Sequence, residues 1–306
     1  MRFNVPHPIP YQGSKRRLAQ AILSHVETGR HARLIEPFAG SAAVTLAASH
    51  SEKFGRFVLG DRLQPLMVLW QDIINNPVAI ANEYGTLWYR EQENPIDEFY
   101  EIRAEFNRDR HPAKLLYLLA RCVKNAVRFN PAGEFNQSPD KRRTGTRPDS
   151  MRKELLSAHR LLTGRTEAIC TDFMNLIEAS EPGDFFYLDP PYQGTSLGRD
   201  TRYIAGVTRD RIIEALTVLN ERDSPFILSY DGSCGDRNYG DRLPNELAER
   251  VLLDVGRSSQ ATLNGNDRNT IESLYISHSL VPASVGGRVM VLGDFEPRVP
   301  VTEFLF

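Results

Sequence analysis

Short apolar runs alternate with stretches of helical periodicity at both ends of this 306-residue chain, and this alternation limits the possible folds more than any other feature. It is typical of parallel strands joined by crossover helices. The runs that predict strands lie at 34–35, 57–59, 168–170, 185–188, 226–230, 251–255 and 274–277. We therefore predict an α/β fold with a doubly wound, mostly parallel sheet.

Helices are predicted between these strands from their apolar stripes and end signals. Ser14 is expected to cap a helix that carries Leu18, Ile22 and Val26 on one side and ends at Gly29. Further helices are predicted over 42–48 and 208–222.

The middle of the chain differs, because no convincing strand occurs between residues 64 and 162. Helical patterns cover 96–106 and 113–127, and a segment rich in proline and glycine follows at 129–148. We predict a helical insert over 64–164 that interrupts a catalytic α/β domain formed by 1–63 and 165–306.

Charge is unevenly distributed along the chain. The formal net charge is −2, yet residues 121–153 hold nine Lys or Arg against three Asp or Glu, a local charge of +6. Such a basic island on an acidic body indicates contact with a polyanion, although a solvated loop has the same composition.

Several classes of protein are excluded by the sequence. No run approaches the ~18 apolar residues of a membrane span, and the first eight residues lack the core of a signal peptide, so we expect a cytoplasmic protein without membrane contact. Cys122, Cys170 and Cys234 are too widely spaced for a zinc motif, and the histidines form no ligand pattern, so neither a metal nor a disulfide is expected.

A motif whose residues could support catalysis follows the fully apolar run 185–188. It consists of Asp189, Pro190, Pro191 and Tyr192. In a parallel sheet the ligand crevice lies beyond the carboxyl ends of the strands. The prolines have no backbone donors and leave carbonyls free as acceptors, while Asp189 adds a carboxylate and Tyr192 a stacking ring. The motif predicts a catalytic pocket for a planar base with an exocyclic amino group, against the alternative of a simple proline turn.

A second motif, residues 36–42, follows the first strand, and Asp61 comes 21 residues after Gly40, at the end of the second. Such spacing brings a ligand close to the glycine backbone and places an acid near a ribose hydroxyl. A dinucleotide fingerprint needs three glycines for its pyrophosphate, whereas this turn has one. The turn therefore suits a nucleoside without phosphates, such as S-adenosylmethionine, unless it serves only helix packing.

A third motif precedes the first helix, where Tyr11 and Lys15 could hold the amino acid end of that cofactor. Tyr11 offers a ring face to the cationic end, and Lys15 a partner for the carboxylate. By itself the motif is equally compatible with an ordinary helix start and a solvated lysine.

In this order the three motifs resemble the Dam-type (α-group) DNA adenine-N6 methyltransferase family, over most of the chain. Residues 36–42 are similar to its EPFxGxG segment and 189–192 to its DPPY motif, while Tyr11 stands in place of its usual tryptophan. The resemblance implies a Rossmann-like methyltransferase sheet with an inserted target-recognition domain, and S-adenosylmethionine as cofactor with S-adenosylhomocysteine as product. The residues it assigns to the cofactor are Tyr11, Lys15, Glu36, Pro37, Phe38, Gly40, Asp61, Asp172, Phe173 and Asp189.

Residues 128–136 are similar to the family's RYNxxGEFN stretch, which implies that Arg128 and Asn130 read DNA. Arginine reads guanine with two hydrogen bonds, whereas the basic residues after it would bind phosphates without reading sequence. Segment 122–125 replaces the family's tyrosine that wedges into the duplex, which argues against a GATC target. The residues expected to bind DNA are Lys124, Arg128, Asn130, Lys141, Arg142, Arg143 and Arg147.

The predicted function is site-specific methyl transfer from S-adenosylmethionine to N6 of a flipped-out adenine in double-stranded DNA, within a restriction-modification or Dam-like system. A separately encoded restriction endonuclease is a further expected partner. Cytosine-N4 methylation stays open as an alternative, because cytosine also carries a conjugated amino group, and so does a catalytically silent regulator that binds cofactor and DNA. A nucleotide-dependent oxidoreductase is disfavoured by the single-glycine turn and the basic insert.

Overall fold

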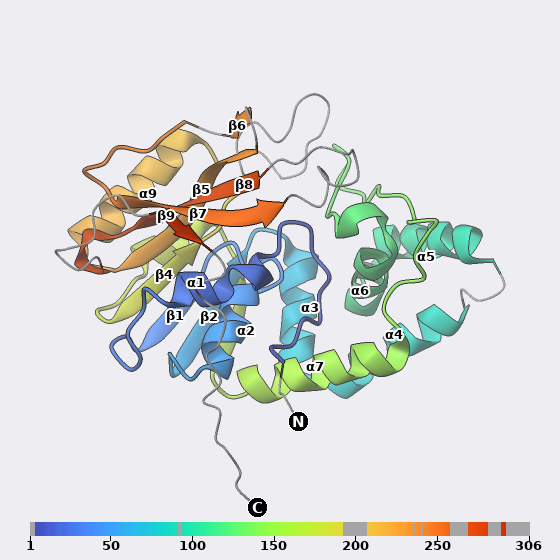
Figure 1. The fold of residues 1–306 in the computed structure, drawn as a ribbon. Coiled ribbons are helices and arrows are strands. Elements are labelled where there is room, and N and C mark those ends of the chain that lie inside the picture. The colour runs from blue at the N-terminus through green and yellow to red at the C-terminus, as the bar shows by residue number, and fades with distance from the viewer. Residues whose placement is uncertain are drawn as a thin grey trace, which may run out of the picture.

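The computed structural model describes residues 4–90, 94–191, 207–234, 237–239, 241–257, 269–280 and 289–291. Its centre is a nine-stranded sheet in the order β3-β2-β1-β4-β5-β8-β7-β9, with β6 paired to β5 (Figure 1). The strands are β1 (Arg33–Glu36), β2 (Arg56–Asp61), β3 (Thr166–Cys170), β4 (Asp184–Leu188), β5 (Phe226–Cys234), β6 (Arg237–Tyr239), β7 (Glu249–Arg257), β8 (Asn269–Ile276) and β9 (Val289–Val291). Every predicted strand therefore occurs, and the predicted α/β class is confirmed.

Strand direction follows the prediction of a mostly parallel sheet. The strands β3, β2, β1, β4 and β5 run parallel, with Ile35 opposite both Val58 and Phe186. Among the described strands β6 and β8 alone oppose their neighbours, β8 being antiparallel to both β5 and β7. The order of strands reverses between β1 and β4, and a crevice beyond the carboxyl ends of the strands is expected at such a reversal.

Strand β4 is buried on both faces, as its apolar sequence predicts. Phe185 and Tyr187 join the core on the side of α1 and α2, while Phe186 and Leu188 join the core on the side of α8 and α9. Burying each such side chain contributes about 1.5–3 kcal/mol, so β4 anchors both layers of the domain.

Nine α-helices are described, and proline in the first turn begins α3, α5, α6 and α7, where its missing N–H costs nothing. The helices are α1 (Ala19–Leu23), α2 (Ala43–His50), α3 (Gln64–Asn75), α4 (Pro77–Arg90), α5 (Pro95–Asp109), α6 (Pro112–Arg121), α7 (Pro148–Leu162), α8 (Phe173–Glu178) and α9 (Arg209–Glu221). Short 3-10 turns are η1 (Lys15–Arg17), η2 (Val123–Asn125) and η3 (His278–Leu280).

Helices α4, α5 and α6 lie to one side of the sheet, beside α3 and α7 (Figure 1). Between β2 and β3 the described residues form no strand, only two isolated bridges. Helix α3 also packs against β2 and β3, so part of the predicted insert covers the sheet. The exact division into domains stays a prediction.

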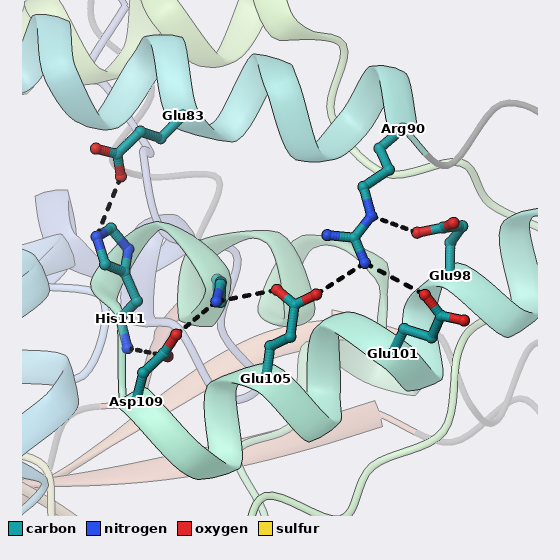
Figure 2. A network of polar contacts seen from close by, with 8 residues as sticks. Glu83, Arg90, Glu98, Glu101, Glu105, Asp109 and His111 are labelled. Atoms are coloured by element: carbon teal, nitrogen blue, oxygen red, sulfur yellow. Dashed lines mark hydrogen bonds and ion pairs between the residues drawn. The ribbon is translucent and has the colours of Figure 1, made fainter.

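Ion pairs join the three outlying helices (Figure 2). Arg90 at the end of α4 reaches Glu98 at 2.6 Å and Glu105 at 2.9 Å, both on α5. Lys114 of α6 reaches Glu105 at 2.9 Å and Asp109 at 2.5 Å. The hydrogen bond from Arg90 is the main reason that the pKa of Glu105 lies below its usual value. Exposed pairs contribute little singly, but a shared network fixes how the helices lie against one another.

Two predicted helices are wrong in extent. The segment after Ser14 forms η1 and the short α1, which ends at Leu23 rather than Gly29. Ser14 caps no helix, because its hydroxyl instead accepts a hydrogen bond from Ser41 at 2.8 Å. The helix predicted over 113–127 ends at Arg121, because Cys122 is extended at ψ 161°, and Lys124 and Asn125 beyond it are left-handed at φ 61° and 52°.

Candidate active site

The carboxyl ends of β1 and β4 lie side by side at the reversal of strand order, and the Gly40 turn and Asp189 follow them. Lys15 Nζ lies 2.8 Å from Asp189 Oδ1 and 3.7 Å from Glu272 Oε2 of β8. Three segments distant in sequence thus meet at the predicted catalytic motif. Pro190 is buried and Pro191 half-buried, whereas Tyr192 lies outside the described residues.

Burial raises the pKa of Asp189 to about 6, even though Lys15 lowers it, and Glu272 adds to the rise. Asp189 is therefore ionised at neutral pH but binds a proton more readily than an ordinary aspartate. Lys15 was expected to pair with a carboxylate of the cofactor. In the structure it pairs with the carboxylate of the catalytic motif, and its contact with the cofactor stays a prediction.

The Gly40 turn is built around Tyr11. Gly40 has φ +47°, and a Cβ there would lie 3.2 Å from Tyr11 Cε1. Trp70 Nε1 donates to the Gly40 carbonyl at 3.0 Å, and the Ala39 amide donates to the Gly60 carbonyl at 2.8 Å. The glycine therefore leaves room for the ring, while the turn is tied to α3 and to β2.

Asp61 at the end of β2 faces the same turn. Its carboxylate accepts from the Leu63 amide at 2.9 Å and lies 3.5 Å from the Gly40 amide. Burial raises the pKa of Asp61 to about 6, although these amides lower it. The structure thus brings together Tyr11, Gly40 and Asp61 from three predicted motifs.

Phe38 and Phe173 form an aromatic wall, with ring centroids 5.0 Å apart. Asp172 caps α8 by accepting from the Met174 amide at 3.0 Å, and Arg211 Nη2 donates to it at 2.7 Å. Burial would raise the pKa of Asp172, but the hydrogen bonds from Arg211 and Met174 outweigh it and the pKa lies below its usual value. Arg211 also lies 4.6 Å from the Phe173 ring centroid. Sequence reasoning missed Arg211, because helix α9 carries no local signal that it reaches α8.

The Glu36 side chain stabilises the fold by hydrogen bonds to a neighbouring helix. Its carboxyl accepts from the Thr45 amide at 3.1 Å and the Thr45 hydroxyl at 2.7 Å, which ties the end of β1 to the first turn of α2. Burial raises the pKa of Glu36 to about 8, so this carboxyl is protonated at neutral pH. Pro37 beside it is buried. The contact with the cofactor expected for both residues stays a prediction.

Residues 128–136 form a hairpin against α5. Phe129 and Phe135 pair as a bridge, and the Phe135 amide donates to the side-chain oxygen of Asn107 of α5 at 2.8 Å. The Asn130 side chain braces the turn, since it donates to the Glu134 carboxylate and accepts from the Glu134 amide, both at 2.9 Å. Asn130 was expected to read DNA, yet both ends of its amide are engaged in this turn.

The basic loop after the hairpin is held by the buried Arg121, which donates to the carbonyls of Asp140 and Arg143. An open groove of about 490 Å³ lies between Pro10, Asn125 and residues 142–146. The Gln12 amide donates to the Asn125 carbonyl at 2.9 Å, so the insert contacts the segment that carries Tyr11. Of the other predicted DNA-binding residues Arg128 is half-buried, whereas Lys124, Lys141, Arg142, Arg143 and Arg147 are exposed.

Two searches for side-chain clusters and long apolar helices cover the described residues only. No three His, Cys, Asp or Glu side chains among them are placed to share a metal ion. None of the described helices has the length and apolar character needed to cross a bilayer.

The chain is similar in sequence to known DNA methyltransferases. A model of the D12 class N6 adenine-specific DNA methyltransferases matches residues 11–259. The DNA N-6-adenine-methyltransferase of Escherichia phage P1 is 28% identical over 236 residues, which cover 73% of this chain but 29% of the phage protein. The Retron Ec67 DNA adenine methylase of Escherichia coli is 29% identical over 231 residues, 72% of this chain and 75% of that one. The Type II methyltransferase M.MjaIII of Methanocaldococcus jannaschii is 23% identical over 190 residues, 58% of this chain and 64% of that one.

The family model spans the Tyr11 segment, the Gly40 turn, the helical region and the motif at Asp189, and it matches well over half of the chain. This chain therefore belongs to the D12 class N6 adenine-specific DNA methyltransferase family.

Proposed function

We propose that this chain transfers a methyl group from S-adenosylmethionine to N6 of an adenine extruded from double-stranded DNA. The observation that carries the proposal is the Asp189 carboxylate, held by Lys15 at 2.8 Å where the strand order reverses. A carboxylate and a proline carbonyl at this place can accept hydrogen bonds from an amino group.

The residues beside Asp189 fit a nucleoside cofactor. A Cβ would fill the space at Gly40 against the Tyr11 ring, the buried Asp61 carboxylate lies next to that turn, and Phe38 and Phe173 form an aromatic wall. Asp61 would accept from ribose hydroxyls, and the aromatic wall would flank the cofactor's adenine. When bound, the cofactor supplies an electrophilic methyl group on a positively charged sulfur.

The adenine amino group is a poor nucleophile, because its lone pair is delocalised into the ring. Hydrogen bonds from that group to Asp189 and to the Pro190 carbonyl localise the lone pair. Once N6 has gained the methyl group it carries one proton too many, and the ionised Asp189 is placed to accept it. Tyr192 would stack on the base.

DNA binding is assigned to the basic part of the insert. Arg128 would read a guanine edge, and the side chains of Lys141, Arg142, Arg143 and Arg147 would bind phosphates. Since Asn130 is engaged with Glu134, we assign it to the shape of the hairpin that presents Arg128. On this basis 64–164 acts as the target-recognition insert of a catalytic domain formed by 1–63 and 165–306.

Asp189→Ala tests the proposal. The variant is expected to lose transfer of labelled methyl to DNA, because no carboxylate meets the amino group, while DNA affinity stays unchanged. Glu214→Ala, which removes an exposed carboxylate of α9, serves as the control and is expected to keep full activity. Mass spectrometry of the product is expected to detect N6-methyladenine. Detection of N4-methylcytosine instead, or wild-type rates in Asp189→Ala, would contradict the proposal.

The place of action and the partners follow from the substrate. We propose that the chain acts on DNA in the cytoplasm, and similarity to a Type II methyltransferase is compatible with a separately encoded restriction endonuclease. A methylome of cells that express this chain, with and without a neighbouring nuclease gene, would test the second point.

A further inference from the structure

Glu272 lies at the candidate active site, and the methyl transfer proposed above assigns it no role. It is on β8, and its Oε2 lies 3.7 Å from Lys15 Nζ. Its side chain is 18% exposed, compared with 8% for Lys15 and 20% for Asp189. Three charged groups therefore lie together in one poorly solvated region, which we call the charged corner.

An irregularity in the sheet sets the position of Glu272. The register between β5 and β8 shifts between Ser229 and Gly232, so that Gly232 stands opposite Glu272. A Cβ at Gly232 would lie 2.6 Å from the Ile271 carbonyl, and glycine is therefore required at this point. Bulges of this kind redirect side chains and are frequent next to active sites.

Stability alone does not explain the second carboxylate. Asp189 already pairs with the Lys15 ammonium at 2.8 Å, so Glu272 leaves the group with a net charge of −1. Two carboxylates near one ammonium repel each other, and such an arrangement is typical of sites tuned for chemistry.

We propose that Glu272 is a positioning residue for methyl transfer. It shares the Lys15 ammonium with Asp189, so that Lys15 orients one oxygen of Asp189 without neutralising the carboxylate that meets the adenine amino group. The inference rests on the proposed function. In this arrangement Asp189 Oδ1 pairs with Lys15, and Asp189 Oδ2 accepts the hydrogen bond from the adenine amino group.

The proton balance explains why partial neutralisation is useful. The new N–C bond at N6 forms as the bond between sulfur and the methyl carbon breaks, and N6 then passes one proton to Asp189 Oδ2. A fully neutralised Asp189 would be a weaker acceptor for that proton. Among the described residues the charged or titratable groups that act on Asp189 are Lys15, Glu272 and the neighbouring Glu36, which is protonated at neutral pH.

The test is the pH profile of the single-turnover methylation rate, measured on the full chain with saturating DNA and S-adenosylmethionine. The wild-type rate is expected to fall below about pH 6, where Asp189 becomes protonated. This fall in rate is the acid limb of the profile. Glu272→Gln removes a charge that raises the pKa of Asp189, so the acid limb is expected to move to lower pH by roughly half a unit or more. The rate on the plateau is expected to drop several-fold, because the proton acceptor is weaker.

Three further variants separate this role from a structural one. Glu272→Asp keeps the charge and is expected to restore the acid limb, Lys15→Met is expected to move it to higher pH, and Glu214→Gln is expected to leave it unchanged. If Glu272→Gln leaves the limb in place, the inference is overturned, whether the variant is fully active or merely less stable. Wild-type protein that forms no N6-methyladenine would overturn the proposed function itself, and the inference with it.

Discussion

Gly40 combines two requirements at one position. Its backbone is left-handed at φ +47°, where an L side chain costs about 1–2 kcal/mol, and the Tyr11 ring occupies the space that a Cβ would enter. Tyr11 and Asp61 both contact this turn, so a change at Gly40 affects both predicted cofactor contacts at once.

Gly40→Ala is therefore expected to weaken S-adenosylmethionine binding by at least about fivefold, since a loss of about 1 kcal/mol corresponds to that factor. Calorimetric titration of both proteins measures it. Gly29→Ala is the matched control, because Gly29 has φ +75° with nothing within 4 Å of a built Cβ. Equal cofactor affinities in the two variants would show that the contact with Tyr11 is irrelevant.

The loop that carries the basic residues depends on one element, α6, through the buried Arg121. Gly145 lies against this arginine with φ +77°, and a Cβ there would be 2.9 Å from Arg121 Cδ and 3.3 Å from the Ala120 carbonyl. Any side chain at Gly145 must therefore displace either Arg121 or the loop that it holds.

Gly145→Ala is expected to destabilise the protein by about 1–3 kcal/mol and to weaken DNA binding several-fold, because Arg142 and Arg143 lose their fixed positions. Denaturant unfolding and fluorescence anisotropy with duplex DNA measure the two effects. Gly164→Ala, at φ +73° with open space around it, is expected to cost stability only. The same DNA affinity in both variants would argue against a role for this loop in binding.

Charge is separated across the molecule as a whole. The +6 of residues 121–153 stands against a total of −2, and two of its exposed members, Arg142 and Arg143, line the groove beside Pro10 and Asn125. The ion pairs between α4, α5 and α6 hold together the helices of the same insert (Figure 2). DNA would thus be attracted to one region of a protein that repels it elsewhere.

DNA affinity is accordingly expected to fall steeply with salt concentration, because phosphate contacts release counterions. Arg142→Ala and Arg147→Ala are each expected to lower the slope of log K against log salt by about 1. Arg222→Ala, at the exposed end of α9, is expected to leave the slope unchanged. A slope near zero for the wild-type chain would rule out phosphate binding by this region.

Much of the fold follows from local sequence. Strand β4 and its neighbours were predicted because apolar runs of this length are buried, and α9 because its apolar stripe has a helical period. Membership of the adenine-specific family, which the family match confirms, was also predictable from three motifs taken in order. The helix expected after Ser14 was wrong because a tertiary contact with Ser41 replaced a local cap.

The sequence by itself determined the α/β class, the edge of the sheet where chemistry would occur, and the family, because apolar periodicity and turn chemistry act over a few residues. Only the tertiary structure decided that Lys15 binds Asp189, that Arg211 holds Asp172, and that Glu272 completes the charged corner. The physical reason is distance along the chain. Such partners come from separate elements, and they meet only once the sheet has formed.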